Sequence, residues 1–274
     1  MSGIVWFLTE TGFGILILSI LEALALLVPL LIAGIVRLLA PKFGLVGGPG
    51  GNQAATSLLL ILALGSCLAG TVNSIRELVK ERQIYSRERA TGLSAGSYLV
   101  SKLIVLSVIS AIQSVILVGI GVIGDKLPPH GSFLGSSFLE LILAMALVSI
   151  ASMSLGLLIS AVVSTSEQSI LLLFPIVIVQ VIMTGGAVPV NKAGLEQVSS
   201  LFPARWGFGA AASTVNLGQI TLPPGAKVMN PDAVWAHTSG QWLYDMGAQL
   251  ALAALFAIIT WWRLAKMGPL KRGA

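Results

Sequence analysis

Long apolar runs separated by short polar segments dominate this sequence. A bilayer core needs about 20 apolar residues of helix, and six runs come near this length or exceed it. We expect spans at approximately 13–39, 54–73, 98–124, 139–163, 169–186 and 246–262. The pattern predicts an all-α integral membrane protein whose residues 1–274 form a single transmembrane domain.

Composition agrees with a membrane protein. The chain is 55% hydrophobic and only 10% charged, whereas soluble domains carry about 25% charged residues. Cys67 is the single cysteine, so an internal disulfide is excluded. His130 and His237 stand far from any acidic or cysteine cluster, and we expect no metal site.

Charge is concentrated in the segment 74–102, between the second and third spans. It contains six of the 16 Lys and Arg residues, and four more follow from Arg263 to the C-terminus. Short loops rich in Lys and Arg face the cytoplasm. We therefore expect both termini on the cytoplasmic side and the segment 191–245 outside.

These charges do not support one another along a single helix. If residues 75–89 form one helix, opposite charges should pair at i,i+3 or i,i+4, and only Glu77–Lys80 does so. Arg76–Lys80 and Glu77–Glu81 are like-charge pairs. Three more charged residues have no opposite charge at either spacing: Arg82, Arg87 and Glu88. The loop is a candidate for docking onto another polypeptide, and solvation by water and lipid phosphates is the alternative.

Several single residues carry local expectations. Gly92 should break the loop helix, and Ser94 is suited to cap the next one. Lys102 can extend towards lipid headgroups. Gln113 is expected to bond to another helix. Glu22 interrupts the first span, where a carboxylate is either functional or a neutral group bonded to a neighbouring helix.

The segment Thr184–Pro189 (TGGAVP) should stop the fifth helix near membrane depth, which predicts a re-entrant outer turn. Irregular backbone at that depth must be buried in protein or line a wet cavity. Val198–Thr214 is predicted to be an amphipathic part of the outer segment. Small and polar residues in the spans are candidates for a substrate path: Ser66, Gly70, Gln113, Gln180, Thr184, Gly185 and Gly186.

Catalytic signatures are absent from the sequence. It contains no HExxH, no GxSxG in an α/β context, no paired-Asp motif and no Walker A motif. A channel-like ring of charge is also missing. We therefore expect that the chain moves or gates something and is not an enzyme by itself, and that it binds no nucleic acid.

The charged segment KERQIYSRERATGLSAGSYLVSK resembles the cytoplasmic loop of ABC-2 type permeases of the G subfamily. There an acidic residue, an apolar–aromatic pair, Arg-Glu and a Tyr-to-Lys helix entry follow in order. Here they are Glu81, Ile84, Tyr85, Arg87, Glu88, Tyr98 and Lys102. A second match joins Phe174-Pro175, TGGAVP and LFPARWGF (201–208), in the family's order.

The likeness extends over residues 54–263 to the membrane half of mycobacterial exporters that fuse forkhead-associated (FHA) domains and a nucleotide-binding domain ahead of six spans. The chain departs from them by beginning about a dozen residues before its first span. We therefore expect a separately encoded permease, a divided gene or a truncated product.

The resemblance implies a homodimer in the bacterial cytoplasmic membrane that exports lipid-like or cell-envelope molecules. ATP and Mg would bind a partner nucleotide-binding domain, with or without a linked FHA domain, and none in this chain. Loop 75–91 would be the coupling helix that meets this ATPase. Its candidate residues are Arg76, Glu77, Lys80, Glu81, Arg82, Tyr85, Arg87, Glu88 and Arg89. A lipid-modifying membrane enzyme and a structural scaffold or immunity protein remain as alternatives.

Overall fold

The computed structural model describes residues 34, 45, 51–190, 194–220 and 232–267. Its long helices are α3 (Gly51–Ser74), α6 (Ala95–Gly121), α7 (Ser137–Val162), α8 (Ser166–Ile182) and α11 (Ser239–Lys266). The shorter helices are α4 (Glu77–Lys80), α5 (Arg82–Ala90), α9 (Leu195–Ser199) and α10 (Pro203–Val215), with 3-10 turns η1 (Leu217–Gln219) and η2 (Ala233–Trp235). The described part of the chain is entirely helical, as predicted, apart from turns and connections.

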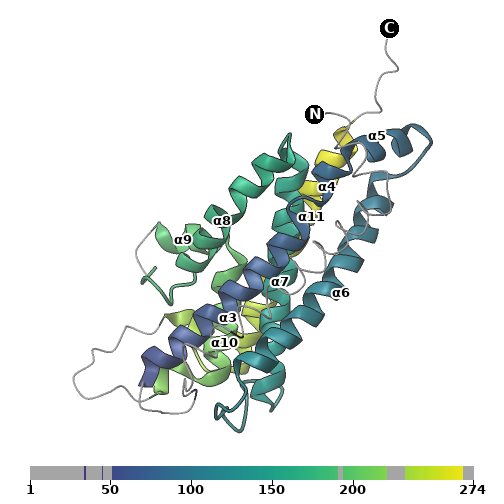
Figure 1. Cartoon of the computed structure of the whole chain (residues 1–274). Helices are drawn as coiled ribbons and strands as arrows, with labels where there is room; N and C mark the ends of the chain where they lie inside the picture. Colours follow the sequence, from purple (N-terminus) through teal and green to yellow (C-terminus); the bar gives the residue numbers. More distant parts are fainter. Residues whose placement is uncertain (1–33, 35–44, 46–50, 191–193, 221–231, 268–274) are drawn as a thin grey trace.

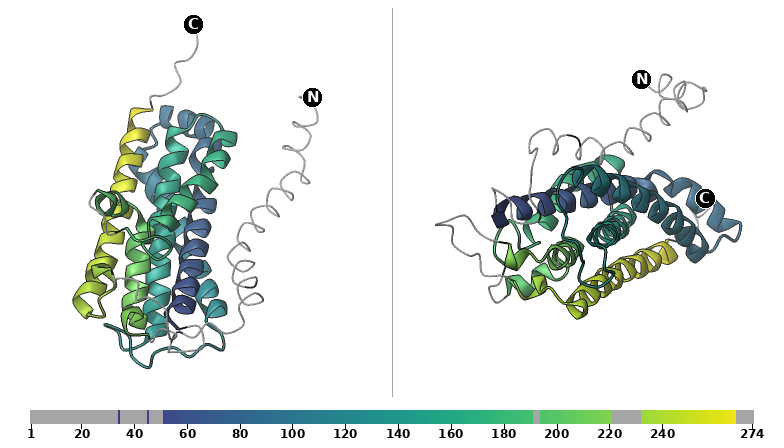
Figure 2. Two further views of the ribbon diagram at one scale, coloured as in Figure 1. Left: turned by 90° about the vertical axis from the view of Figure 1, so that its left-hand side faces the viewer. Right: turned by 90° about the horizontal axis from the view of Figure 1, so that it is seen from below.

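Figures 1 and 2 show an elongated bundle in which α3, α6, α7 and α11 run roughly parallel. The central helix is α7, which contacts α3, α6, α8, α10 and α11. α4 and α5 lie at one end of the bundle beside the last turn of α11, which we call the α5 end; the opposite end, where α10 packs, is the α10 end (Figure 1).

Four described helical segments are long and apolar enough to cross a membrane: Gln53–Lys80, Ala95–Gly121, Ser137–Val162 and Ser239–Lys266. They match the spans predicted at 54–73, 98–124, 139–163 and 246–262. α8 has 17 residues, about 26 Å of helix, which is shorter than a hydrocarbon core of about 30 Å. The span predicted at 13–39, with Glu22, lies outside the described residues.

The last helix begins seven residues before its predicted start. Thr238 caps it by accepting a bond from the Gln241 backbone N–H. Gln241 and Asp245 break the apolar pattern, but Gln241 Nε2 donates to Asp245 Oδ1 over 2.7 Å. Polar residues that bond within the helix can therefore extend it beyond its apolar run.

α10 corrects the amphipathic interpretation of residues 198–214. All but one of its residues are buried, the exception being the partly exposed Trp206. α10 packs against α3, α7, α8 and α11. Its many Gly, Ala and Ser residues explain this, because small side chains let neighbouring helices approach on every side.

Candidate functional site

The charged loop folds as two short helices rather than one. α3 ends at Ser74, and Glu81 separates α4 from α5. The loop ends at Gly92, whose φ of +108° suits glycine. Ser94 then accepts a bond from the Ser97 backbone N–H and caps α6. The predictions for Gly92 and Ser94 are both confirmed.

One side of the loop is bonded to the end of α7. The backbone N–H groups of Leu78 and Val79 both donate to Ser160 Oγ over 3.0 Å. Arg82 Nη2 donates to the Val163 carbonyl over 2.8 Å and to the Ala161 carbonyl over 3.4 Å. The last carbonyls of a helix lack intrahelical partners and attract cations, so Arg82 stabilises the end of α7.

α5 meets the end of α11 in the same way. The Tyr85 hydroxyl donates to the Leu264 carbonyl over 3.0 Å, and Arg89 Nη2 donates to the Ala265 carbonyl over 3.1 Å. Burial raises the pKa of Tyr85 above its ordinary value, against the opposing effect of Arg89. Tyr85 therefore remains a neutral donor at physiological pH.

Lys102 of α6 ties the loop to a third helix. Its Nζ lies 2.6 Å from Glu77 Oε1 and 2.8 Å from Glu81 Oε1, and the Tyr98 hydroxyl donates to Glu81 Oε2 over 2.8 Å. Burial alone would raise the pKa of Glu81. The hydrogen bonds from Lys102 and Tyr98, with the charges of Lys102 and Lys80, outweigh burial and lower that pKa. Lys102 is thus an internal ion-pair partner, which corrects the expectation that it extends to headgroups.

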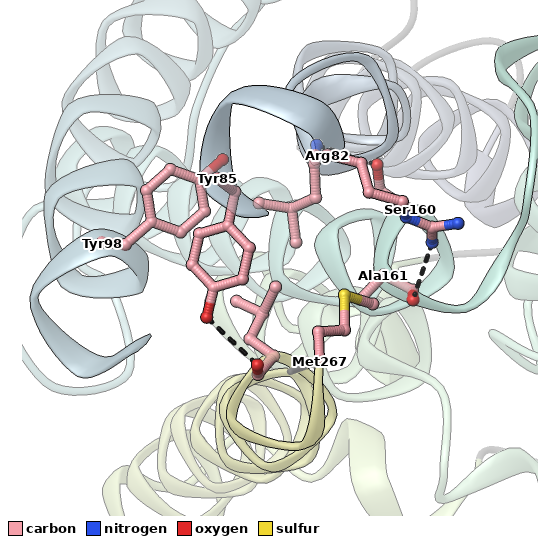
Figure 3. Close-up of a pocket in the computed structure, with 8 residues that line it drawn as sticks. Arg82, Tyr85, Tyr98, Ser160, Ala161 and Met267 are labelled. Carbon is pink, nitrogen blue, oxygen red and sulfur yellow. Dashed lines mark hydrogen bonds between the residues drawn. The ribbon is translucent and has the colours of Figure 1, made fainter. Parts of the chain in front are cut away.

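These contacts enclose a narrow crevice where α4, α5, α6, α7 and α11 meet (Figure 3). Tyr85 and Tyr98 line it with their rings tilted by 38° to each other and the ring centroids 4.8 Å apart. The remaining lining residues are Leu78, Arg82, Ser160, Ala161, Leu264 and Met267. The crevice is the seam along which the loop is held against the bundle.

The other side of α5 is exposed. Ile84 is 51% exposed despite its apolar side chain, and Arg87 and Glu88 lie one turn further along. Among the residues that the structure describes, neither Arg87 nor Glu88 has a side-chain hydrogen bond or ion pair. We call Ile84, Arg87 and Glu88 the open face of α5.

Of the three charges expected to be unpaired, Arg82 is engaged inside the chain, which corrects that expectation for this residue, whereas Arg87 and Glu88 bond to no described residue. Glu77–Lys80 is the predicted pair, at 3.8 Å. Arg82 lacks an acidic partner, but its Nη2 bonds to carbonyl oxygens of the same chain. Four more loop residues bond within the chain: Glu77, Glu81, Tyr85 and Arg89. Arg76, in contrast, is exposed.

The residues predicted for a substrate path are dispersed through the protomer. Ser66 and Gly70 lie in the interior, and a Cβ on Gly70 would overlap the Ser149 carbonyl oxygen of α7. Their close packing is thus between α3 and α7 of one chain. Gln113 accepts a bond from Asn73 Nδ2 over 2.7 Å, the interhelical bond expected for it.

Gln180 and the turn after α8 are buried as well. Ser152 Oγ donates to Gln180 Oε1 over 3.0 Å, which joins α7 to α8. Thr184 is buried, and Gly186 packs directly against the Phe208 ring of α10. Gly185, with φ of +84°, backs onto Arg205 of α10. The turn is held by α10, in accordance with the requirement that such backbone be covered by protein.

Sequence reasoning assigned no role to four charged residues at the α10 end. Arg205 Nη2 lies 2.9 Å from Asp232 Oδ2, and Asp245 is buried on α11. Glu140 accepts three bonds from the backbone N–H groups of residues 132–134 and one from Thr214. The sequence feature that could have identified them is a charged residue within or beside an apolar run, because such a residue in a membrane protein is by default a candidate for a functional role.

The described residues contain no group of three or more His, Cys, Asp or Glu side chains that could hold a metal ion. Cys67 is buried and reduced. The described contacts at the α5 end are ion pairs and hydrogen bonds between helices.

Comparison with known proteins gives two findings. A family model described as ABC-2 type transporter matches residues 15–215. An ABC transporter ATP-binding/permease protein of Mycobacterium tuberculosis is 38% identical over 209 residues, which cover 76% of this chain. The matched region is 24% of that relative, so this chain corresponds to about a quarter of its length.

Proposed function

The chain belongs to the ABC-2 type transporter family, and we propose that it is the membrane-spanning permease of an ATP-driven exporter. ATP hydrolysis, with its Mg, takes place on a partner nucleotide-binding domain. The relative's description as an ATP-binding/permease protein supports such a partnership. α4 and α5 then form the coupling element.

The observation that carries this proposal is the two-sided character of α5. One side is bonded to α7 and α11 through Arg82, Tyr85 and Arg89. The open face presents an apolar side chain beside two opposite charges. An apolar centre with flanking polar groups is typical of a protein interface.

The bonded side supplies the connection to the membrane helices. A displacement of α5 reaches α7 through the Val163 carbonyl and α11 through the Leu264 carbonyl. The ion pairs of Lys102 carry movement of α4 to α6. Movement of α4 and α5 would thus reach the three long helices α6, α7 and α11. Such a connection is needed if closure of an ATPase dimer beneath the membrane is to move the spans.

The finer points of the proposal come from the family resemblance. We propose six spans, a homodimer, a bacterial cytoplasmic membrane location with both termini cytoplasmic, and export of lipid-like or cell-envelope molecules. The proposed partner is an ATPase with or without a linked FHA domain. Because Ser66, Gly70 and Thr184 are buried inside the protomer, a path along them would form only when α3, α7 and α8 separate.

Charge reversal on the open face tests the coupling role. Arg87→Glu should leave insertion and folding intact, since Arg87 is exposed and bonds to no described residue. It should weaken association with the ATPase and abolish transport-linked ATP hydrolysis. Lys126→Glu, at an exposed lysine of the α6–α7 connection, is the matched control and should retain both. Wild-type association and transport in Arg87→Glu would exclude the open face as the docking surface.

A further inference from the structure

Three charged side chains lie near one another at the α10 end, apart from the coupling element. Arg205 of α10 is 1% exposed, and Asp245 of α11 is fully buried. Asp232, just before η2, completes the group through its 2.9 Å ion pair with Arg205. We call Arg205, Asp232 and Asp245 the buried charge cluster.

The buried charge cluster contains two carboxyl groups and one cation. Arg205 Nη2 pairs with Asp232, whereas Arg205 Nη1 is buried without a hydrogen-bond partner among the described residues and forms no ion pair with Asp245. Asp245 Oδ1 accepts a bond from Gln241 Nε2, but Asp245 Oδ2 is buried and has no hydrogen-bond partner among the described residues. An ionised carboxylate in this state is costly, and buried acids without a partner cation take up a proton instead.

The surroundings of Asp245 Oδ2 favour a proton over a larger cation. The oxygen lies 3.1 Å from the position of a Cβ on Gly209, so the α10 backbone closes that side. Gln249 Oε1, one turn along α11, is a second buried acceptor without a donor and lies 3.2 Å from the corresponding position on Gly207. A metal ion needs several ligands around it, whereas a proton needs only one acceptor.

The other ionisable groups of the packed elements are turned elsewhere. Glu140 of α7 faces the residue 132–134 backbone and Thr214. His237, between η2 and α11, lies with Nδ1 2.6 Å from the Ser213 carbonyl oxygen. Among the described residues, Arg205 and Asp232 remain as the charged groups that act on Asp245.

We propose that Asp245 is a proton-binding site between α10 and α11, which holds a proton on Oδ2 while these helices are packed together. Separation of α10 from α11 would admit water to the carboxyl group, which then ionises and releases the proton. Repacking of the helices takes a proton back. Opening and closing of this end of the bundle would thus be linked to the uptake of one proton per protomer.

Infrared spectroscopy tests the proposal directly. The wild-type chain and Asp245→Asn, each in lipid nanodiscs at neutral pH, are compared by difference spectra in H₂O and D₂O. We expect a carboxylic acid C=O band that shifts in D₂O and is lost in Asp245→Asn. Asp245→Glu, which keeps an acid at this position, should move the band without removing it.

Thermal unfolding supplies an independent measurement. Asp245→Asn replaces the neutral acid with a neutral amide of the same shape and should keep the wild-type melting temperature at neutral pH. Asp232→Asn, the matched control, should lower it because Arg205 loses its partner. As the pH rises, the wild-type melting temperature should fall relative to that of Asp245→Asn, since the folded state holds a proton that the unfolded state releases.

Two results would overturn the assignment. One is a wild-type spectrum without an acid band, which decides the matter even if neither variant folds. The other is an equal loss of melting temperature in Asp245→Asn and Asp232→Asn, which would indicate that Asp245 is an ionised partner of Arg205. Neither readout depends on an ATPase or on transport, so failure here is distinguishable from failure of the coupling role.

Discussion

Replacement of Lys102 by methionine should release the coupling element from the bundle without unfolding the bundle. Methionine keeps the length and apolar stem of lysine but removes the ammonium group that bonds Glu77 and Glu81. The two carboxylates are then left facing each other at i,i+4, an arrangement that is itself unfavourable by a few tenths of a kcal/mol, roughly.

The magnitude follows from the exposure of the three side chains, which are between 21% and 25% exposed. Hydrogen bonds to charged groups contribute about 1.5–3 kcal/mol each, whereas exposed ion pairs contribute under about 1 kcal/mol. Partial exposure places each bond between these limits, at about 1 kcal/mol. With the added repulsion, the loss is roughly 2–3 kcal/mol of local stability, or about 30- to 150-fold in the opening equilibrium.

Hydrogen–deuterium exchange measured by mass spectrometry is the appropriate assay. Peptides covering residues 75–91 should exchange about 30- to 150-fold faster in Lys102→Met, because local opening governs their protection, while peptides of α7 keep wild-type rates. Lys126→Met, which removes an exposed lysine elsewhere, should change neither. Unchanged exchange in residues 75–91 would refute the reasoning, and equally faster exchange in α7 would show that the ion pairs support the whole bundle.

Three further predictions concern packing, pH and topology. Gly70→Ala should lower the melting temperature, because the added Cβ would overlap the Ser149 carbonyl oxygen and overpacking costs about 1–3 kcal/mol. A wild-type melting temperature would mean that α3 and α7 can move apart enough to accept the methyl group. The lowered pKa of Glu81 means that its stabilising contribution is present above the ordinary carboxyl pKa of 4.5 and is lost as the pH falls below it. A spin label on Gln83→Cys should accordingly become more mobile in acid, and Glu81→Gln should remove this change. In intact cells, an impermeant thiol reagent should label Gly218→Cys but not Gln83→Cys, and the reverse pattern would invert the proposed topology.

The features that the sequence predicted correctly are those determined by neighbouring residues. Gly92 and Ser94 mark a helix break and a helix cap through contacts within three residues. Apolar length alone was enough to locate four of the long helices. The start of α11 was misplaced because Gln241 and Asp245 satisfy each other inside the helix, which an apolar pattern does not register.

The contacts that hold the candidate site were beyond prediction, because they join distant parts of the chain to backbone atoms. Tyr85 bonds to Leu264, 179 residues away, and Arg82 to Val163, 81 residues away. A carbonyl oxygen is present at every residue, so no side-chain pattern identifies the one that is used. Burial of α10 was missed for a similar reason, since helix contacts on several sides leave no single apolar face.

The use of backbone acceptors has a consequence for how this interface can change during evolution. Arg82, Tyr85 and Arg89 each need their own donor group, whereas the positions that receive these bonds contribute only a main-chain oxygen. Val163 and Ala265, which are only partly buried, can be exchanged for other residues without loss of the acceptor, whereas Ala161 and Leu264 are also restricted by packing in the core. Sequence drift should therefore be asymmetric across the seam, with Arg82, Tyr85 and Arg89 restricted and the partly buried acceptor positions permissive. A saturation library of both sides, selected for function, would show this difference. Few residue types would be accepted at the donor positions and many at the partly buried acceptor positions.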